Sequence, residues 1–257
     1  MKKFIGDFVV SENIPLKNNH FLLKLTQAEP LPLMLPGQFV QLKIDDTSSA
    51  FLRRTFSINY VDRIKNEIWL LIQVVGDGTR SLSKYKIGDS LNLIYPLGNS
   101  FSMPTVTQSR LLLVGGGVGV APLLFLGAVL AEKGYLPSFL IGARNVDGLI
   151  ELEKFQQFGD VYVTTEDGSA GEIGFVTNHS ILKNAFDKIY TCGPTPMMQA
   201  IAQFADNKSI DCEVSLENKM ACGIGACLCC VTQTHQGNQC VCTDGPVFKT
   251  NELVWQI

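Results

Sequence analysis

Between residues 111 and 122 the chain reads Leu111-Leu112-Leu113-Val114-Gly115-Gly116-Gly117-Val118-Gly119-Val120-Ala121-Pro122, an apolar run joined by glycines to a second apolar run. The uncharged segment from Leu111 to Ala131 is long enough to cross a bilayer. Clustered glycines and a proline near its middle are, however, typical of a turn between a buried strand and a helix. We therefore expect a strand at 111–114, a glycine loop, and a helix at 120–133.

The glycine loop has the strand-to-helix context of a dinucleotide-binding loop. Its candidate residues are Gly115, Gly117 and Gly119, although Val120 occupies the position where the G-x-G-x-x-G pattern needs its last glycine. No acid follows the next apolar run, and Arg144 stands there instead, where a cation can meet a 2′-phosphate. Tight packing of a helix on a strand would select the same glycines, so both interpretations stay open.

Further apolar runs follow in the C-terminal direction, at 139–141, 161–163 and 189–191, with a helical pattern at 196–206. Strands that alternate with helices predict a parallel, doubly wound sheet. Cys192 ends the run at 189–191, at the carboxyl edge where open α/β sheets bind ligands. A lone cysteine is also an ordinary small core residue.

The N-terminal part of the chain has a different pattern, with short apolar runs between turn signals such as Pro36-Gly37 and Asp45-Asp46. Regularly spaced short strands predict a small antiparallel β-barrel. The expected strands cover residues 20–25, 38–44, 56–61, 67–75 and 90–95. A polar stretch at 99–109 is the expected linker to the α/β part.

Length and composition agree with a globular protein of two or three modest domains. The chain has 257 residues, of which 46% are hydrophobic and 18% are charged, so a disordered polymer is excluded. The net charge is −3 and the basic residues are scattered, which gives no footprint for nucleic acid or for an anionic membrane. An early acid at Asp7 argues against a signal peptide, and we expect a cytoplasmic protein.

Eight cysteines are present, and six of them lie between Cys222 and Cys242. The spacing Cys222-x4-Cys227-x2-Cys230 matches the beginning of the plant-type [2Fe–2S] pattern, in which a fourth cysteine follows later. Either Cys240 or Cys242 can supply this fourth ligand. A four-cysteine zinc site is the main alternative, but such sites favour paired C-x2–4-C knuckles.

A second constellation lies in the barrel part, where Arg54-Thr55-Phe56-Ser57 begins an expected strand. These side chains can offer a guanidinium to a diphosphate, an aromatic ring to a flat ring system, and a hydroxyl to a ring nitrogen. Gly78 and Thr79 belong to a turn that leads into a short helix, where free N–H groups suit a second diphosphate contact. Taken singly, each feature also fits an edge strand or a plain hairpin turn.

Together these motifs resemble the ferredoxin-reductase flavoprotein superfamily. Arg54-Thr55-Phe56-Ser57 is similar to its R-x-[YF]-[ST] flavin motif, the glycine loop to its nucleotide loop, and Cys192-Gly193-Pro194 to its C-G-P signature. More narrowly, residues 215–227 (SLENKMACGIGAC) and 242–248 (CTDGPVF) resemble the electron transfer subunits of type B dihydroorotate dehydrogenases.

The resemblance implies three parts: an FAD-binding β-barrel at 1–101, a pyridine-nucleotide-binding α/β domain at 102–211, and a [2Fe–2S] module at 212–257. It assigns the cluster ligands to Cys222, Cys227, Cys230 and Cys242, leaving Cys229 and Cys240 as extra thiols, and it places Cys192 beside the nicotinamide. The flavin contacts that it implies are Arg54, Thr55, Phe56, Ser57, Leu71, Ile72, Gln73, Gly78 and Thr79.

The resemblance also implies an activity and a partner. An FMN-containing catalytic subunit would oxidise dihydroorotate in pyrimidine biosynthesis, and this chain would relay the electrons through the [2Fe–2S] cluster and FAD to NAD⁺. Two copies of each chain would form a heterotetramer. Two alternatives stay open: a subunit of another FAD/[2Fe–2S] complex, of the hydrogenase or ferredoxin:NADP reductase type, and a non-catalytic zinc-binding interaction protein.

Overall fold

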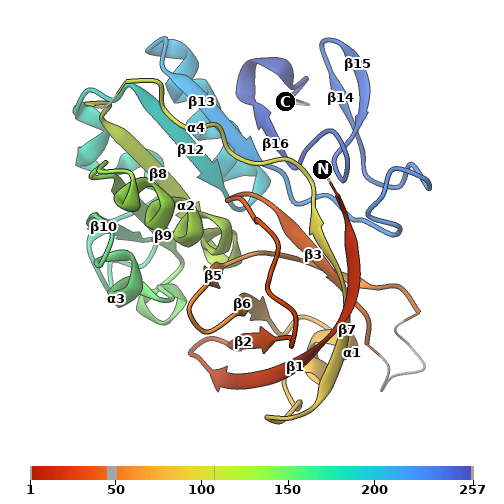
Figure 1. Cartoon of the computed structure of the whole chain (residues 1–257). Helices are drawn as coiled ribbons and strands as arrows, with labels where there is room; N and C mark the ends of the chain where they lie inside the picture. The colour runs from red at the N-terminus through yellow and green to blue at the C-terminus, as the bar shows by residue number, and fades with distance from the viewer. Residues whose placement is uncertain (1, 45–50, 107, 256–257) are drawn as a thin grey trace.

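The computed structural model describes residues 2–44, 51–106 and 108–255. It contains two seven-stranded sheets and one separate two-stranded hairpin (Figure 1). None of the described helices is long and apolar enough to cross a membrane. The turn expected at Asp45-Asp46 lies outside the described residues.

The first sheet is antiparallel throughout and has the strand order β4-β3-β7-β1-β2-β6-β5. Its edge strands β4 and β5 follow one another in the chain, separated only by Ile58 and Asn59, so the sheet must curl until its two edges come near each other. The expected antiparallel barrel is therefore confirmed. The bounds are β1 Phe4–Pro15, β2 His20–Thr26, β3 Phe39–Leu42, β4 Arg54–Ser57, β5 Tyr60–Asp62, β6 Glu67–Gln73 and β7 Ser90–Leu97, with α1 at Asp77–Leu82 between β6 and β7.

The second sheet has the order β11-β10-β9-β8-β12-β13-β16, and its strands are parallel except for β16 at the edge. From β8 the order runs one way through β9 and β10 and the other way through β12 and β13, which is the doubly wound arrangement. The bounds are β8 Leu111–Gly116, β9 Ser138–Ala143, β10 Asp160–Thr165, β11 Glu172–Ile173, β12 Lys188–Cys192, β13 Asp211–Ser215 and β16 Val247–Lys249.

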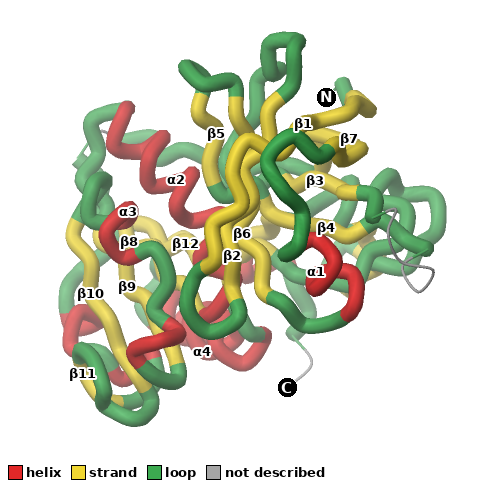
Figure 2. The backbone as a smooth tube through the Cα atoms, turned by 90° about the horizontal axis from the view of Figure 1, so that it is seen from below, coloured by secondary structure: helices red, strands yellow, loops and turns green. Residues whose placement is uncertain are grey.

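Helices cover both faces of this sheet, as Figure 2 shows for α2 (Ala121–Glu132) and α4 (Thr195–Asn207). Leu111 and Leu113 of β8 belong to the core on the α2 side, whereas Leu112 and Val114 belong to the core on the α4 side. The remaining helical segments are α3 Leu152–Phe155 and the 3₁₀ turns η1 Gly117–Val120, η2 Val146–Gly148, η3 Val176–Asn178, η4 Ser180–Lys183 and η5 Thr250–Glu252.

Helix α2 is apolar on nearly every side because it is enclosed between the two sheets. Leu123 and Leu124 pack in the core of the second sheet, and Phe125 packs in the core of the barrel. A helix that is hydrophobic all round must be buried on more than one face. The burial of α2 therefore explains the uncharged segment that is long enough to span a bilayer.

The cysteine-rich segment leaves the second sheet after β13 and returns to it at β16. Between these strands lie the cysteine loop and the hairpin of β14 (Val231–Thr234) and β15 (Gly237–Cys240), drawn in blue in Figure 1. The expected limit at residue 211 falls on the first residue of β13, so the segment after it also contributes β13 and β16 to the sheet.

Candidate functional site

A cavity of about 250 Å³ lies where the barrel, the second sheet and the cysteine segment meet. Seven of the residues expected to contact a flavin line it: Thr55, Phe56, Ser57, Leu71, Ile72, Gln73 and Thr79. The same cavity is also lined by Val118 and Ala121 from the glycine loop and α2, together with Leu216, Glu217, Met220 and Pro246 from the cysteine segment. The structure thus brings three separate sequence motifs to one cavity.

Arg54 and Gly78 do not line the cavity, but they lie next to each other beside it. A Cβ atom on Gly78 would be 3.3 Å from Nε of Arg54, and the guanidinium donates a 2.6 Å hydrogen bond to the carbonyl oxygen of Leu52. The positive charge therefore sits at the start of β4, close to the turn that begins α1. This position suits a diphosphate that leaves the cavity.

The cavity wall contains a polar atom that needs a ligand. The hydroxyl oxygen of Thr55 is buried and has no hydrogen-bond partner within the described part of the chain. Buried polar atoms are nearly always hydrogen-bonded in native proteins, so an unpaired one on a cavity wall indicates a missing ligand. The residues present therefore fit a flavin with polar ring atoms.

The Thr79 hydroxyl is already occupied by the protein. It accepts hydrogen bonds from the backbone N–H groups of Val75 (2.9 Å) and Gly76 (3.2 Å) and donates to the Gly76 carbonyl oxygen (3.1 Å). Thr79 thus shapes the turn before α1, and only the remaining surface of its side chain is free to face the cavity.

The glycine loop combines tight packing with an open turn. Gly119 lies against the Cys192-Gly193 backbone, where an added Cβ atom would come within 2.6 Å of the Gly193 nitrogen. Gly117 has a φ of +57°, and the space around it is open. The packing interpretation therefore applies to Gly119, whereas the open turn at Gly117 is compatible with a dinucleotide contact, which stays a prediction.

Cys192 is wholly buried at the carboxyl end of β12, as expected, and its Sγ lies 3.9 Å from Oε1 of Glu217. Burial raises the pKa of the Cys192 thiol well above its ordinary value. The thiol is therefore neutral at physiological pH and suits packing rather than nucleophilic attack.

Sequence reasoning did not single out Glu217 as a site residue. Its side chain is open to water, lines the same cavity as Ser57, and is surrounded by enough protein for desolvation to raise the pKa of its carboxyl. It belongs to the stretch Ser215-Leu216-Glu217-Asn218, whose resemblance to a known family was the only signal that pointed to it.

The cysteine segment holds its four expected ligands as two pairs. The backbone N–H of Cys227 donates to Sγ of Cys222 at 3.4 Å, and the N–H of Cys242 donates to Sγ of Cys230 at 3.4 Å. Within the residues that the structure describes, no three metal-binding side chains converge on a single point. Two cysteine pairs match a two-iron cluster, which needs two cysteines for each iron.

Backbone N–H groups are directed at the sulfur atoms. The N–H groups of Ile224, Ala226 and Cys227 point to Sγ of Cys222 at 3.5, 3.3 and 3.4 Å, and the N–H of Gly225 points to Sγ of Cys242 at 3.2 Å. These bonds, led by that of Ile224, lower the pKa of Cys222 to about 6. Burial and the Cys230 thiol raise the pKa of Cys242 to about 12. The N–H groups around Cys222 thus stabilise negative charge on its sulfur, whereas burial disfavours the thiolate of Cys242.

The two extra thiols have different surroundings. Cys229 is exposed and donates to the Lys219 carbonyl oxygen at 3.6 Å, while Cys240 lies at the end of β15 opposite Val231. Cys242 is fully buried and accepts the hydrogen bond from Gly225. This difference favours Cys242 over Cys240 as the fourth ligand.

The cysteine loop rests directly on barrel strand β3. Nε2 of the buried Gln41 donates to the Ala221 carbonyl oxygen at 3.2 Å. Gly223 has a φ of +67°, and a Cβ atom there would lie 2.5 Å from Cδ of Gln41. Gly223 therefore permits both the turn and the close approach of the loop to the barrel.

Comparison with known proteins identifies the family. Residues 217–254 match the model of the iron-sulfur cluster binding domain of dihydroorotate dehydrogenase B. The electron transfer subunit of dihydroorotate dehydrogenase B (NAD(+)) from Fusobacterium nucleatum is 35% identical, over 97% of this chain and 98% of that protein. The corresponding subunit from Caldanaerobacter subterraneus is 42% identical, over 86% of this chain and 87% of that protein. The chain belongs to the family of dihydroorotate dehydrogenase B electron transfer subunits.

Solved structures agree with this family. The structure described as the NADH-dependent reduced ferredoxin-NADP oxidoreductase superposes with a TM-score of 0.87 at 28% identity, over 96% of this chain and 90% of that chain. The ferredoxin reductase of carbazole 1,9a-dioxygenase shares the fold, with a TM-score of 0.70 at 20% identity over 82% of this chain and 67% of that chain.

The expected membership in the dihydroorotate dehydrogenase B family, within the ferredoxin-reductase fold, is confirmed, and so is an oxidoreductase role. The cofactors FAD and [2Fe–2S], with NAD as substrate, agree with the matched domain and with the fold. The residues assigned to each cofactor and the three domain limits stay predictions.

Proposed function

We propose that this chain carries electrons between NAD⁺ and an FMN-containing partner that oxidises dihydroorotate in pyrimidine biosynthesis. One observation supports this role above the others. The segment that holds the paired cysteines also supplies Leu216, Glu217, Met220 and Pro246 to the wall of the cavity lined by Thr55, Phe56 and Ser57. A cluster on the cysteines and a flavin in the cavity would therefore be near neighbours.

The chain would bind and orient the flavin rather than carry out the chemistry. Arg54 would neutralise the diphosphate, the Thr55 hydroxyl would bond a polar ring atom, and Ser57 would face the reactive edge of the ring. When bound, FAD supplies hydride exchange with NAD and one-electron exchange with the cluster. Cys192 would pack beside the nicotinamide, where its neutral thiol adds no charge.

The cysteine loop would hold the cluster through Cys222 with Cys227 and Cys230 with Cys242. The N–H groups directed at Cys222 and Cys242 would stabilise its negative charge and thereby tune its reduction potential. Cys229 and Cys240 would remain free thiols.

The partner would meet the exposed edge of the cysteine loop. Ile224 and Leu228 are 49% and 64% exposed there, and the φ of Leu228 is +58°. A left-handed backbone that keeps a leucine in solvent is costly and is typical of sites where function requires it. We expect two copies of each subunit to assemble, in the cytoplasm.

Anaerobic co-expression of the tagged chain with its untagged neighbours tests this proposal. Purified protein should contain one FAD and two irons per chain, together with an FMN-bearing partner that oxidises dihydroorotate. A colourless preparation that contains zinc would contradict the electron-transfer role. Co-purification with a ferredoxin- or hydrogenase-type partner would keep the relay but assign it to a different complex.

A further inference from the structure

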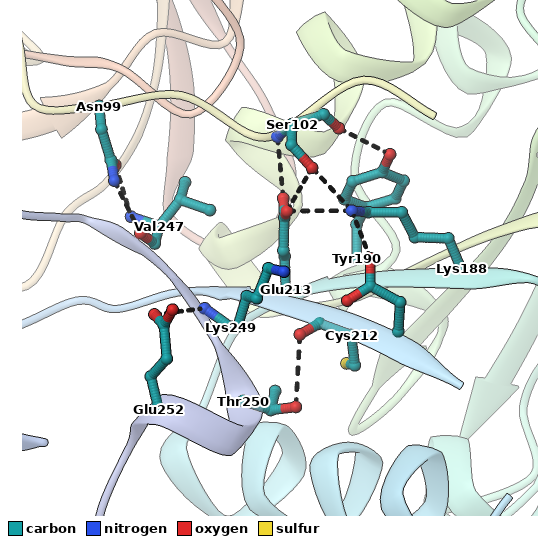
Figure 3. Close-up of polar contacts among 11 residues, drawn as sticks. Asn99, Ser102, Lys188, Tyr190, Cys212, Glu213, Val247, Lys249, Thr250 and Glu252 are labelled. Atoms are coloured by element: carbon teal, nitrogen blue, oxygen red, sulfur yellow. Dashed lines mark hydrogen bonds and ion pairs between the residues drawn. The ribbon is translucent and has the colours of Figure 1, made fainter. Parts of the chain in front are cut away.

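Asn99 follows β7 and is hydrogen-bonded to the cysteine segment through all the polar atoms of its side chain. Nδ2 donates to the carbonyl oxygens of Asp244 (2.9 Å) and Val247 (2.8 Å), and Oδ1 accepts from the N–H of Val247 (2.9 Å). The Asn99 backbone N–H donates to the Gly245 carbonyl oxygen at 2.6 Å. Figure 3 shows the Asn99 side chain directed at Val247.

The bonded segment, residues 244–247, connects the proposed cluster site to the cavity. At one end, Oδ2 of Asp244 accepts from the N–H of Cys240 at 2.7 Å and closes the turn that contains Cys242. At the other end, Pro246 lines the cavity, and its carbonyl oxygen accepts from the N–H of Leu216 at 2.9 Å. A shift of this segment would move Cys242 relative to the cavity.

Asn99 itself is held firmly on the barrel side. The preceding Gly98 packs so closely on barrel strand β3 that a Cβ atom would lie 2.8 Å from Cε1 of Phe39, and the Gly98 carbonyl oxygen accepts from Nε2 of Gln38 at 3.1 Å. Three residues later, Ser102 is bonded to Lys188 and Glu213 of the second sheet. The linker is therefore anchored on both sides of Asn99 (Figure 3).

We propose that Asn99 is a positioning residue that sets the distance between the cluster on the cysteine segment and the flavin in the cavity. The inference rests on the proposed relay function. Electron exchange between two fixed centres falls steeply as their separation grows, so an anchor of the intervening segment controls its rate. Asn99 is such an anchor, because it joins residues 244–247 to the barrel, which lines the flavin cavity.

The test compares Asn99→Asp with Asn66→Asp in the cofactor-loaded protein. Asn66 makes a similar set of bonds, accepting from the N–H of Leu31 and donating to the carbonyl oxygens of Gln27 and Glu29, but all within the barrel. Each substitution by aspartate keeps the Oδ1 acceptor, removes the two N–H donors of Nδ2, and places a negative charge next to two carbonyl oxygens. Asn99→Ser is a neutral second variant that also loses these bonds.

Three readouts separate positioning from general damage. With Asn99→Asp, we expect iron and flavin contents and the rate of flavin reduction by NADH to match the parent, while flavin-to-cluster transfer in stopped-flow spectroscopy slows about ten-fold. Asn99→Ser should slow it less. Hydrogen exchange in the peptide that spans 244–247 should rise in both Asn99 variants, with or without cofactors, and Asn66→Asp should change neither transfer nor this exchange.

Parent-like transfer in Asn99→Asp would overturn the proposal, and so would equal slowing in Asn66→Asp. Loss of iron from both Asn99 variants would also overturn it, because the residue would then hold the cluster rather than position it. These outcomes differ from a failure of the relay function, in which the parent itself would lack flavin or iron.

Discussion

Cys240 and Cys242 stand two residues apart, and their environments differ. Cys242 is fully buried and bonded to the Gly225 N–H, whereas Cys240 is half-buried at the end of a hairpin strand. We therefore expect Cys242→Ser to lose the cluster iron and its EPR signal, because a serine oxygen is a poor replacement for a soft thiolate. Cys240→Ser and Cys229→Ser serve as controls and should retain both. Equal iron loss from Cys240→Ser and Cys242→Ser would contradict the assignment.

Gly119 gives a second prediction for a single residue. In Gly119→Ala the new methyl group would meet the Gly193 backbone, which cannot rotate away as a side chain can. We expect the free energy of unfolding to fall by about 1–3 kcal/mol, the range for overpacking, in urea titrations monitored by far-UV circular dichroism. In Gly6→Ala the methyl group meets only side-chain atoms of Tyr95 and Gln27, the nearest being the Tyr95 hydroxyl at 3.3 Å, so the loss should be much smaller. A parent-like Gly119→Ala would show that the loop can move away from β12.

The sequence predicted the site best where its residues are close along the chain. The Arg54–Ser57 run, the glycine loop and the Cys222–Cys230 spacing each form one local structure, so their types and order suffice. Glu217, Gln41 and Asn99 act through partners far away in the chain, and no local pattern distinguishes them from ordinary polar residues. The cavity is formed only when these distant segments fold together.

At the scale of elements, most expected strands and both long helices are present, and the misses have physical causes. Strand β1 has apolar residues on both faces, such as Ile5 and Val9 outside and Phe8 and Val10 inside, so it lacks clear alternation. Strand β13 was missed because its buried positions include Glu213, which is paired with Lys188 and interrupts the apolar pattern. The expected strand at 56–61 is two strands, because the chain passes from one barrel edge to the other at Ile58 and Asn59.

The 3₁₀ turn η4 supplies a pH-dependent element. Nδ1 of the buried His179 accepts the N–H of Ile181 at 3.0 Å, and burial lowers the pKa of His179 below its ordinary value of 6.5, outweighing the effect of nearby Glu172. The unfolded chain therefore takes up this proton before the folded protein does. The contribution of His179 to stability is full above about pH 6.5 and declines as the pH falls below it.

Replacing His179 by asparagine tests this element. In His179→Asn a neutral acceptor can still bond the Ile181 N–H, but the titrating group is lost. We expect the melting temperature of the parent to fall more than that of His179→Asn between about pH 8 and about pH 5. If the melting temperatures of the parent and of His179→Asn fall equally with pH, His179 is not responsible for the pH dependence of stability.

At the scale of the whole molecule, a buried polar network joins the linker to the second sheet. Nζ of Lys188 donates to Ser102 (2.7 Å), Asp211 (2.7 Å) and Glu213 (3.0 Å), and Glu213 also accepts from the N–H and hydroxyl of Ser102. The Tyr190 hydroxyl donates to the Ser102 carbonyl oxygen at 2.8 Å. The network therefore fixes the linker, which leaves the barrel after β7, against the second sheet.

Breaking this network should destabilise the protein as a unit. Lys188→Met leaves Glu213 charged and nearly enclosed, so we expect a loss of about 3–5 kcal/mol in the free energy of unfolding. The double variant Lys188→Met/Glu213→Gln removes the uncompensated charge and should recover part of this loss in denaturant titrations. Arg110→Met, which breaks the exposed pair with Asp187, should have a much smaller effect. Additive losses in the double variant would contradict a coupled network.

The cysteine segment starts after β13 and ends at β16 of the same sheet, so it is an insertion between two strands rather than a unit attached at one end. Its two ends are hydrogen-bonded neighbours in one sheet, where Ser215 pairs with Val247. The entropy cost of closing a loop rises only slowly with its length, so the sheet tolerates wide variation in what lies between these strands. A longer, shorter or different redox module between these two strands would therefore leave the shape of the flavin- and NAD-binding part unchanged. In this architecture the module that exchanges electrons with the partner is replaceable, and the flavin-binding part is constant.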